Sequence, residues 1–533
     1  RRAIDVAAGV ETDDGRGRTF SLSYRYGRNQ AVTRDNARVD AVRLRAALDV
    51  TACAATAGCA PVDFFTAPEI SNDALDYIVI PELRRTLTIS EHEVAAAGAL
   101  DLDFGDDRAG RFAAGLEFRR TSFSDRDLTP PDAAPIAYFR GENSEVHLET
   151  YDAYAQFEAD LVRTGSLPGD IDGSLAARFT GSSQHDAVFN FEAGLDWRPA
   201  PGVALFARRH IGERAPDVIE LFSLGPRFEQ AFVDPCGLPP SRQSANVQAN
   251  CASGSPLGVG PGFVQTEPLA TMTIYGNPAL APEQVRSAVY GVSLSPEAWT
   301  GALQGRLELS AAWYDFKITD AVSTEEAPIA VCYASAGFSS PACGVNPRTG
   351  APSIIRDPVT RQIESFDLFL RNEAAFEWRG LDLEFRYAGE PAFLPFADLF
   401  WISALHTYTD RVISDAGTGE RQHLEGLIDF PRHRTLATVG LETGAWTFVA
   451  YANRRGRVLT IRTDEPEARV PAAFYLDLTA RLTLNVRTYL QAGVQNVTDL
   501  EPAITAYNDV GNFAAEFYDP VGRRYVASFR VRF

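Results

Sequence analysis

The last thirteen residues of the chain, Val521–Phe533, read VGRRYVASFRVRF, and this stretch decides the fold. Its apolar residues share one parity: Tyr525, Ala527, Phe529, Val531 and Phe533. Its polar residues share the other parity, with Val526 as an exception: Arg524, Ser528, Arg530 and Arg532. A β-strand points successive side chains to opposite faces, so the pattern predicts a strand with one apolar and one charged face. Lipid suits the first face and a watery lumen suits the second, which is typical of an outer-membrane β-barrel.

Length and charge narrow the class of protein. The chain has 533 residues, 45% of them hydrophobic, and a formal net charge of −20. A single soluble core usually stops growing at about 250–300 residues, so the length predicts several domains or one large closed barrel. No uninterrupted apolar run approaches the ~18 residues that a spanning helix needs. The negative charge argues against a nucleic-acid binder, whose affinity rests on Lys and Arg against phosphates.

Alternating segments and short polar turns follow one another along the chain. The predicted hairpin turns lie at 13–15, 105–108, 199–202, 297–299, 389–391, 442–444 and 483–486. Long stretches without alternation lie between them, at 51–92, 212–283, 321–367, 410–431, 456–470 and 498–520. Loops above ~12–15 residues are uncommon in compact soluble domains, whereas outer-membrane barrels combine short periplasmic turns with long extracellular loops. We therefore predict an all-β fold, a large transmembrane antiparallel β-barrel of about 18–22 strands, near the 22 of plugged transporters.

All six cysteines fall in the predicted long loops, as three pairs close in sequence: Cys53 and Cys59, Cys236 and Cys251, Cys332 and Cys343. Short disulfide clips of this kind suit an oxidising compartment. Metal ligation is the alternative, but it needs histidines at finger-like spacing and none lies close to these pairs. We predict three disulfides and no metal site.

Several segments, in this order along the chain, resemble TonB-dependent outer-membrane receptors. They are RAPDVIELF at 214–222, GNPALAPE at 276–283, GLDLE at 380–384, QNVTD at 495–499 and the aromatic end at Phe533. The resemblance implies active uptake of a scarce, bulky nutrient, such as a siderophore, cobalamin or an oligosaccharide, with energy from TonB. It implies residence in the bacterial outer membrane and no cofactor.

The same resemblance implies several partners. These are outer-membrane lipid and lipopolysaccharide, TonB, a small-molecule or oligosaccharide ligand, and the assembly machinery that reads Tyr525, Phe529 and Phe533. Such receptors carry an N-terminal plug preceded by the short box that binds TonB, and neither is recognisable in this sequence. The first residues, RRAIDVAAGV, also lack a signal peptide. We expect residues 1–533 to be the barrel portion, with the plug and signal peptide missing.

Two other functions fit parts of the pattern. One is a passive, porin-like outer-membrane channel, and the other is a secreted β-sandwich adhesin or glycan binder, whose apolar faces would be buried. An enzyme is not expected, because the sequence has no nucleophile elbow and no catalytic residue can be assigned. Substrate-binding residues are not assigned either. The three arginines of the last strand are expected to pair with carboxylates of the lumen or plug.

Overall fold

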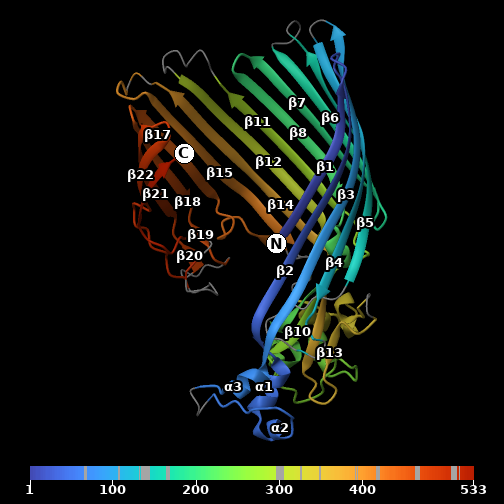
Figure 1. The fold of residues 1–533 in the computed structure, drawn as a ribbon. Helices are drawn as coiled ribbons and strands as arrows, with labels where there is room; N and C mark the ends of the chain where they lie inside the picture. Colours follow the sequence, from blue (N-terminus) through green and yellow to red (C-terminus); the bar gives the residue numbers. More distant parts are fainter. Residues whose placement is uncertain are drawn as a thin grey trace.

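The structure of the chain is a computed structural model. It describes residues 1–64, 69–105, 108–130, 133, 144–163, 169–295, 305–324, 327–346, 350–390, 392, 394–415, 421–461, 468–505, 513–514 and 517–532. Within these residues, one sheet of 21 strands dominates the fold. Its strands tilt and curve around a hollow, with the long loops gathered at the lower end of Figure 1. The all-β prediction and the expected strand number are confirmed.

The wall of this sheet consists of strands that pair antiparallel with their neighbours along the chain. The first of them are β1 (Arg2–Asp13), β2 (Arg18–Val39), β3 (Val79–Gly105), β4 (Arg108–Asp127), β5 (Ser144–Val162), β6 (Asp170–Ser182), β7 (Val188–Ala200) and β8 (Val203–Arg214). The rest are β11 (Glu283–Leu294), β12 (Gly305–Thr324), β14 (Ile363–Gly389), β15 (Leu399–Asp415), β17 (His433–Thr443), β18 (Trp446–Arg455), β21 (Ala473–Asn485), β22 (Thr488–Gln495) and β23 (Arg524–Val531). Among the described residues, β1 pairs only with β2 and β23 only with β22, so these two strands are the edges of the wall.

The last strand has the two faces that its sequence predicts. Phe529 lies opposite Leu490 and Tyr525 opposite Val494, so one face of β22 and β23 is apolar. Arg530 lies opposite Tyr489 on the other face. Among the residues that the structure describes, none covers the apolar face of β23, where Tyr525 is 75% exposed and Phe529 63% exposed. An exposed apolar band of this kind is what a hydrocarbon environment covers.

The strand pairings of the predicted hairpins are confirmed, and two details differ from the prediction. The predicted turn at 297–299, residues 106 and 107 of the turn at 105–108 and residue 391 of the turn at 389–391 lie outside the described residues. The segment 79–92 was expected in a loop, but β3 already begins at Val79. This end of the long strand packs against protein: Ile80 and Leu83 are buried beside Ala133, and Leu87 and Ile89 pack against a hydrophobic cluster that includes Phe123. The hairpin of β5 and β6 was not predicted. Alanines occupy much of its apolar face and Tyr154 lies on its polar face, so the alternation in sequence is weak.

Two of the long stretches are not irregular. The stretches 212–283 and 321–367 contain β9 (Leu224–Ala231), β10 (Leu269–Tyr275), β13 (Ile354–Arg356) and the first residues of β14. They also contain α4 (Val218–Phe222), α5 (Ala245–Cys251), α7 (Pro328–Ala334) and the 3-10 turns η1 (Pro235–Gly237), η2 (Pro240–Arg242), η3 (Ala336–Phe338) and η4 (Pro341–Cys343). Together they form a folded unit at the long-loop end of the sheet, here called the cap (Figure 1).

The remaining loops carry short elements. The loop after β2 holds α1 (Ala41–Leu48), α2 (Val50–Ala54) and α3 (Asn72–Ile78), and Ser71 caps α3 as predicted. Near the end of the chain lie β16 (Gln422–His423), β19 (Val458–Leu459) and β20 (Arg469–Val470). No helix among the described residues is both long and apolar enough to cross a membrane.

Candidate functional site

The cap is built from two loops that come from different hairpins. β10, in the loop between β8 and β11, pairs in parallel with the start of β14, where Thr271 lies opposite Ser365 and Tyr275 opposite Phe369. β9 and β13 flank this pair on either side. Further along, β14 pairs with β12 in the wall. The cap sheet therefore continues directly into the wall through β14.

A hydrophobic core fills the cap. Its buried residues come from both loops and include Met272, Tyr333, Ile363 and Phe366. Tyr333 is fully buried and Ile363 is 1% exposed. A stretch of loop acquires such a core only when it folds as a unit, because burying these side chains offsets the entropy lost on ordering the backbone.

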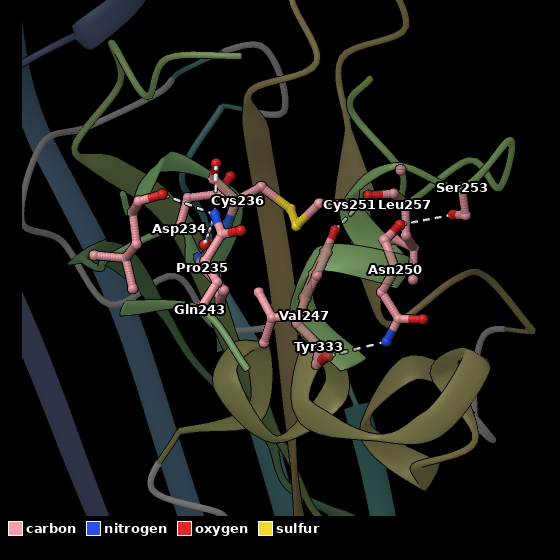
Figure 2. The surroundings of a disulfide bond; sticks show 12 residues. Asp234, Pro235, Cys236, Gln243, Val247, Asn250, Cys251, Ser253, Leu257 and Tyr333 are labelled. Atoms are coloured by element: carbon pink, nitrogen blue, oxygen red, sulfur yellow. Dashed lines mark hydrogen bonds between the residues drawn. A yellow bond between two sulfur atoms is a disulfide. The ribbon is translucent and has the colours of Figure 1, made fainter. Parts of the chain in front are cut away.

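Each disulfide joins two cysteines of the same loop. The structure pairs Cys53 with Cys59, Cys236 with Cys251, and Cys332 with Cys343, which are the pairs that the sequence predicts. The last two lie inside the cap, and Figure 2 shows the Cys236–Cys251 bond beside Val247 and Asn250. The Asn250 amide donates to the carbonyl of Tyr333 at 3.0 Å. This contact joins the first cap loop to the second.

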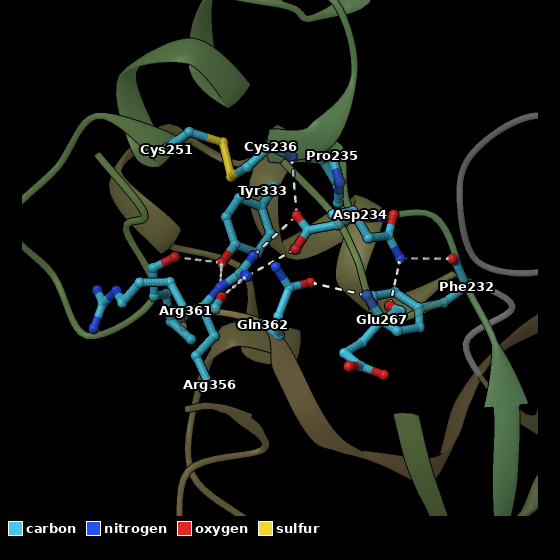
Figure 3. Close-up of polar contacts among 12 residues, drawn as sticks. Phe232, Asp234, Pro235, Cys236, Cys251, Glu267, Tyr333, Arg356, Arg361 and Gln362 are labelled. Carbon is cyan, nitrogen blue, oxygen red and sulfur yellow. Dashed lines mark hydrogen bonds and ion pairs between the residues drawn. A yellow bond between two sulfur atoms is a disulfide. The ribbon is translucent and has the colours of Figure 1, made fainter. Parts of the chain in front are cut away.

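A buried ion pair joins the same two loops. Asp234 Oδ2 lies 2.7 Å from Arg356 Nη1, and both side chains are fully buried. Arg356 Nε donates to the hydroxyl of Tyr333 at 2.8 Å, and that hydroxyl donates to the carbonyl of Leu257 at 2.5 Å (Figure 3). Burial raises the pKa of the Tyr333 phenol to about 12, although the nearby Arg356 charge opposes the shift. The charged groups and the phenol of this cluster therefore have hydrogen-bond partners, as burial demands.

The family-like segments meet at the foot of the cap. Arg214, in RAPDVIELF, forms ion pairs with Glu220 of the same segment at 2.9 Å and with Glu283 of GNPALAPE at 2.5 Å. The backbone amide of Asn277 donates to the backbone carbonyl of Glu220 at 2.9 Å. Asp217 and Glu220 also form a reciprocal cap at the start of α4. These residues anchor the cap loop to the ends of β8 and β11, as expected for a strand-to-loop junction.

The polar face of the wall carries a network of charges. Ion pairs join its strands: Arg25–Asp5 at 2.6 Å, Arg119–Glu93 at 3.3 Å, Arg178–Glu117 at 3.4 Å and Arg178–Asp152 at 2.9 Å. Near the short turns, the same face forms a hollow of about 710 Å³. Its charged lining residues are Asp101, Arg111, Glu158, Asp160, Asp172, Glu192, Asp196 and Arg208. A wall of this chemistry faces water, so the charged side is the lumen side.

The predicted residues of the last strand are only partly placed. Arg524 pairs at 3.0 Å with Asp519 of the loop that precedes this strand. Tyr525 and Phe529 lie on the apolar face, while Phe533 lies outside the described residues.

Asp234, Tyr333 and Arg356 were not singled out from sequence, because a lone charge in a long loop looks solvated. The nearest signal was the neighbouring Cys236 and Cys332, which implied ordered loops. Within the described residues, no group of three or more possible metal ligands lies together.

The exposed apolar band, the charged lumen face and the folded outer loops define a β-barrel protein of the bacterial outer membrane. The sequence matches the model of the family described as TonB dependent receptor-like, beta-barrel, over residues 4–497. The chain belongs to this family, which is one of outer-membrane receptors rather than enzymes. No curated protein matches the chain by sequence.

Solved structures share the fold. The siderophore receptor PirA from Acinetobacter baumannii superimposes with a TM-score of 0.59 at 12% identity, over 100% of this chain and 62% of PirA. A mutant of the ferric enterobactin receptor PfeA from Pseudomonas aeruginosa gives a TM-score of 0.53 at 11% identity, over 99% of this chain and 69% of PfeA. At these identities the likeness concerns the fold alone. The chain spans less than two thirds of the length of PirA.

Proposed function

We propose that this protein is an active-transport receptor that takes up a scarce, bulky nutrient across the outer membrane with energy from TonB. The observation that carries the proposal is the family match over residues 4–497. A sheet of this size supports it, because a barrel of about 20 strands has a lumen too wide for its own side chains to fill. The nutrient class is a siderophore, cobalamin or an oligosaccharide, and PirA and PfeA are named for siderophores.

The secreted β-sandwich fits the structure poorly. In a sandwich, the apolar faces of two sheets pack against each other. Here Val10 is 66% exposed, Phe20 51% and Leu116 64%, all on the apolar face of the wall. A passive channel remains the rival to be tested, since it would share this exposed band.

A plug explains how a wide barrel stays closed, and we propose that one occupies this lumen, from a part of the protein outside residues 1–533. The directions of the edge strands support further wall strands as well. β1 and β23 both run from the long-loop end to the short-turn end. Direct pairing would make them parallel, so an all-antiparallel barrel needs an odd number of further strands between them.

The remaining partners belong to the same proposal. TonB would contact the plug side of the protein, and lipid and lipopolysaccharide would cover the apolar band. The assembly machinery would read the aromatic face of the last strand, including Tyr525 and Phe529, which are open to solvent along β23.

Growth of a deletion strain on single nutrient sources tests the function. We expect the strain to lose growth on one bulky iron, cobalamin or oligosaccharide source, and the intact gene to restore it. Loss of TonB should abolish the restored growth. Uptake that continues without TonB, together with steady conductance of the purified protein in planar bilayers, would assign the passive channel instead.

A further inference from the structure

Four arginines form a grid on the lumen face at the long-loop end of β17 and β18. Arg434 lies directly opposite Arg455 in the register of these strands. The amide of Gly456 donates to the carbonyl of His433 at 2.7 Å, so the ladder continues by one step beyond β18. The next opposed pair is then Arg432 and Arg457. We call these four residues the arginine quartet.

The register makes both pairs of the quartet close. Since Gly456 and His433 form a hydrogen-bonded pair, the pairs on either side of them are of the non-hydrogen-bonded kind. Side chains of such pairs approach closely, with Cβ atoms about 4.5–5.5 Å apart. Residues two apart on a strand share a face, so the extended ladder places Arg432 and Arg457 on the same face as Arg434 and Arg455.

That side is the lumen side. Arg434 lies opposite Thr407 of β15, whose hydroxyl donates to Asp382 of the polar face at 2.7 Å. The neighbouring Arg454 lies opposite Phe474 instead, on the apolar face. The quartet therefore faces the lumen, at the long-loop end of β17 and β18.

Only part of the quartet is compensated. Arg432 lies 3.3 Å from Glu425, and Arg455 donates to the carbonyl of Phe517 at 2.8 Å and lies over its ring. The side chains of Arg434 and Arg457 are exposed and make no hydrogen bond or ion pair with other residues that the structure describes. Arg469 adds a further cation on the exposed side of the β19–β20 pair, whose other side buries Val458 and Val470.

Like charges directly opposite each other destabilise a sheet. The four arginines of the grid therefore repel one another unless an anion lies between them. Guanidinium groups bind carboxylate, phosphate or catecholate oxygens through paired hydrogen bonds, and several of them together select a multiply charged ligand.

We propose that the arginine quartet is a binding site for a multiply anionic, oxygen-rich nutrient on its way into the lumen. This inference rests on the proposed uptake function and specifies its substrate class. Neutral nutrients such as uncharged oligosaccharides, and cationic ones, are excluded as substrates of this site.

Binding of two iron complexes of opposite charge to the full-length receptor in detergent tests the site. The probes are a trianionic ferric tris-catecholate and the monocationic ferrioxamine B, followed by quenching of tryptophan fluorescence. We expect the anionic complex to bind more tightly and its affinity to fall as salt rises. In R434Q/R457Q the affinity should fall about tenfold or more, and R434K/R457K should recover part of it. R454Q is the matched control on the opposite face and should bind as the unchanged receptor does.

Several outcomes would overturn the inference. They are failure of the unchanged receptor to bind the anion, equal binding of both probes, or equal affinity in R434Q/R457Q once heat-modifiable gel mobility has shown that the variant is folded. Equal affinity with increased antibiotic entry through R434Q/R457Q would assign these arginines to plug contacts. TonB-dependent growth on a neutral or cationic nutrient would refute the anion site and leave the transport function standing.

Discussion

Asp234 and Arg356 lie 122 residues apart in sequence, yet their side chains meet at 2.7 Å with no exposure to solvent. Asp234 belongs to the loop between β8 and β11, and Arg356 to the loop between β12 and β14. If either loop leaves the cap, the buried charge on the other loop loses its ion-pair partner. The ion pair thus makes the folding of the two loops interdependent.

We expect Arg356→Ala to destabilise the cap by about 3–5 kcal/mol, because a buried carboxylate is left without its partner. Hydrogen exchange should show faster opening of β10 and β13, with β21 and β22 unchanged. The matched control is Arg306→Ala, which breaks the exposed pair with Glu308 and should cost no more than ~1 kcal/mol. Equal exchange in the two variants would show that the buried pair does not hold the cap.

The disulfides of the cap should matter for a different reason. Cys236 and Cys251 close a loop of 15 residues, so replacing both with alanine should cost about 3 kcal/mol of cap stability. Limited proteolysis should then cut the cap while the wall stays intact. The Cys53→Ala/Cys59→Ala variant should leave cap cleavage unchanged, because that bond lies in a different loop, the one after β2 that carries α1, α2 and α3. Cap cleavage at the same rate in both variants would contradict this.

Tyr333 should make the cap sensitive to strong alkali. Burial raises its pKa from the ordinary value near 10 to about 12, so folding favours the neutral phenol. The resulting stabilisation, about 2–3 kcal/mol, is fully present below pH 10 and is lost as the pH rises through about 12. The difference in absorbance at 295 nm between the unchanged protein and Tyr333→Phe should titrate near pH 12. A difference that titrates near pH 10 would mean that the phenol is not buried.

The wall could be predicted from sequence because the alternation of apolar and polar residues that marks each strand lies within a short segment of the chain. Phe474, Leu476 and Leu478 alternate with polar residues within one strand, and the structure places them on the apolar face. Where the residues on the two faces differ less in polarity, as in β5 and β6, the same reasoning found nothing. The pattern depends on what each face contacts, and a face of alanines gives little contrast.

The cap could not be predicted, because its order comes from contacts between distant segments. β10 and β14 pair in parallel across more than 90 residues, and no local pattern marks such a pairing. Only the clustered cysteines indicated that these loops are ordered. The arginine quartet was missed for a similar reason. Its four members alternate with other residues in two separate segments, and only the register brings them into one grid.

The two faces of β21 should respond oppositely to a charge. Leu478 lies on the apolar face and the adjacent Thr479 on the lumen face. Leu478→Arg should destabilise the protein in liposomes by about 2–4 kcal/mol if it lies near the bilayer midplane, and Thr479→Arg by far less. Equilibrium unfolding in urea measures both values. A larger loss in Thr479→Arg would reverse the assignment of the faces.

The central claim is that the apolar side of each wall strand meets hydrocarbon while its other side meets water. Nitroxide labels placed one at a time on cysteines at positions 525–530 of β23, in the full-length receptor in liposomes, test it most directly. We predict that accessibility to oxygen peaks at 525, 527 and 529, and that accessibility to a water-soluble nickel complex peaks at the positions between them. Labels at 525, 527 and 529 that neither reagent reaches would show that protein covers this side, and would contradict the assignment.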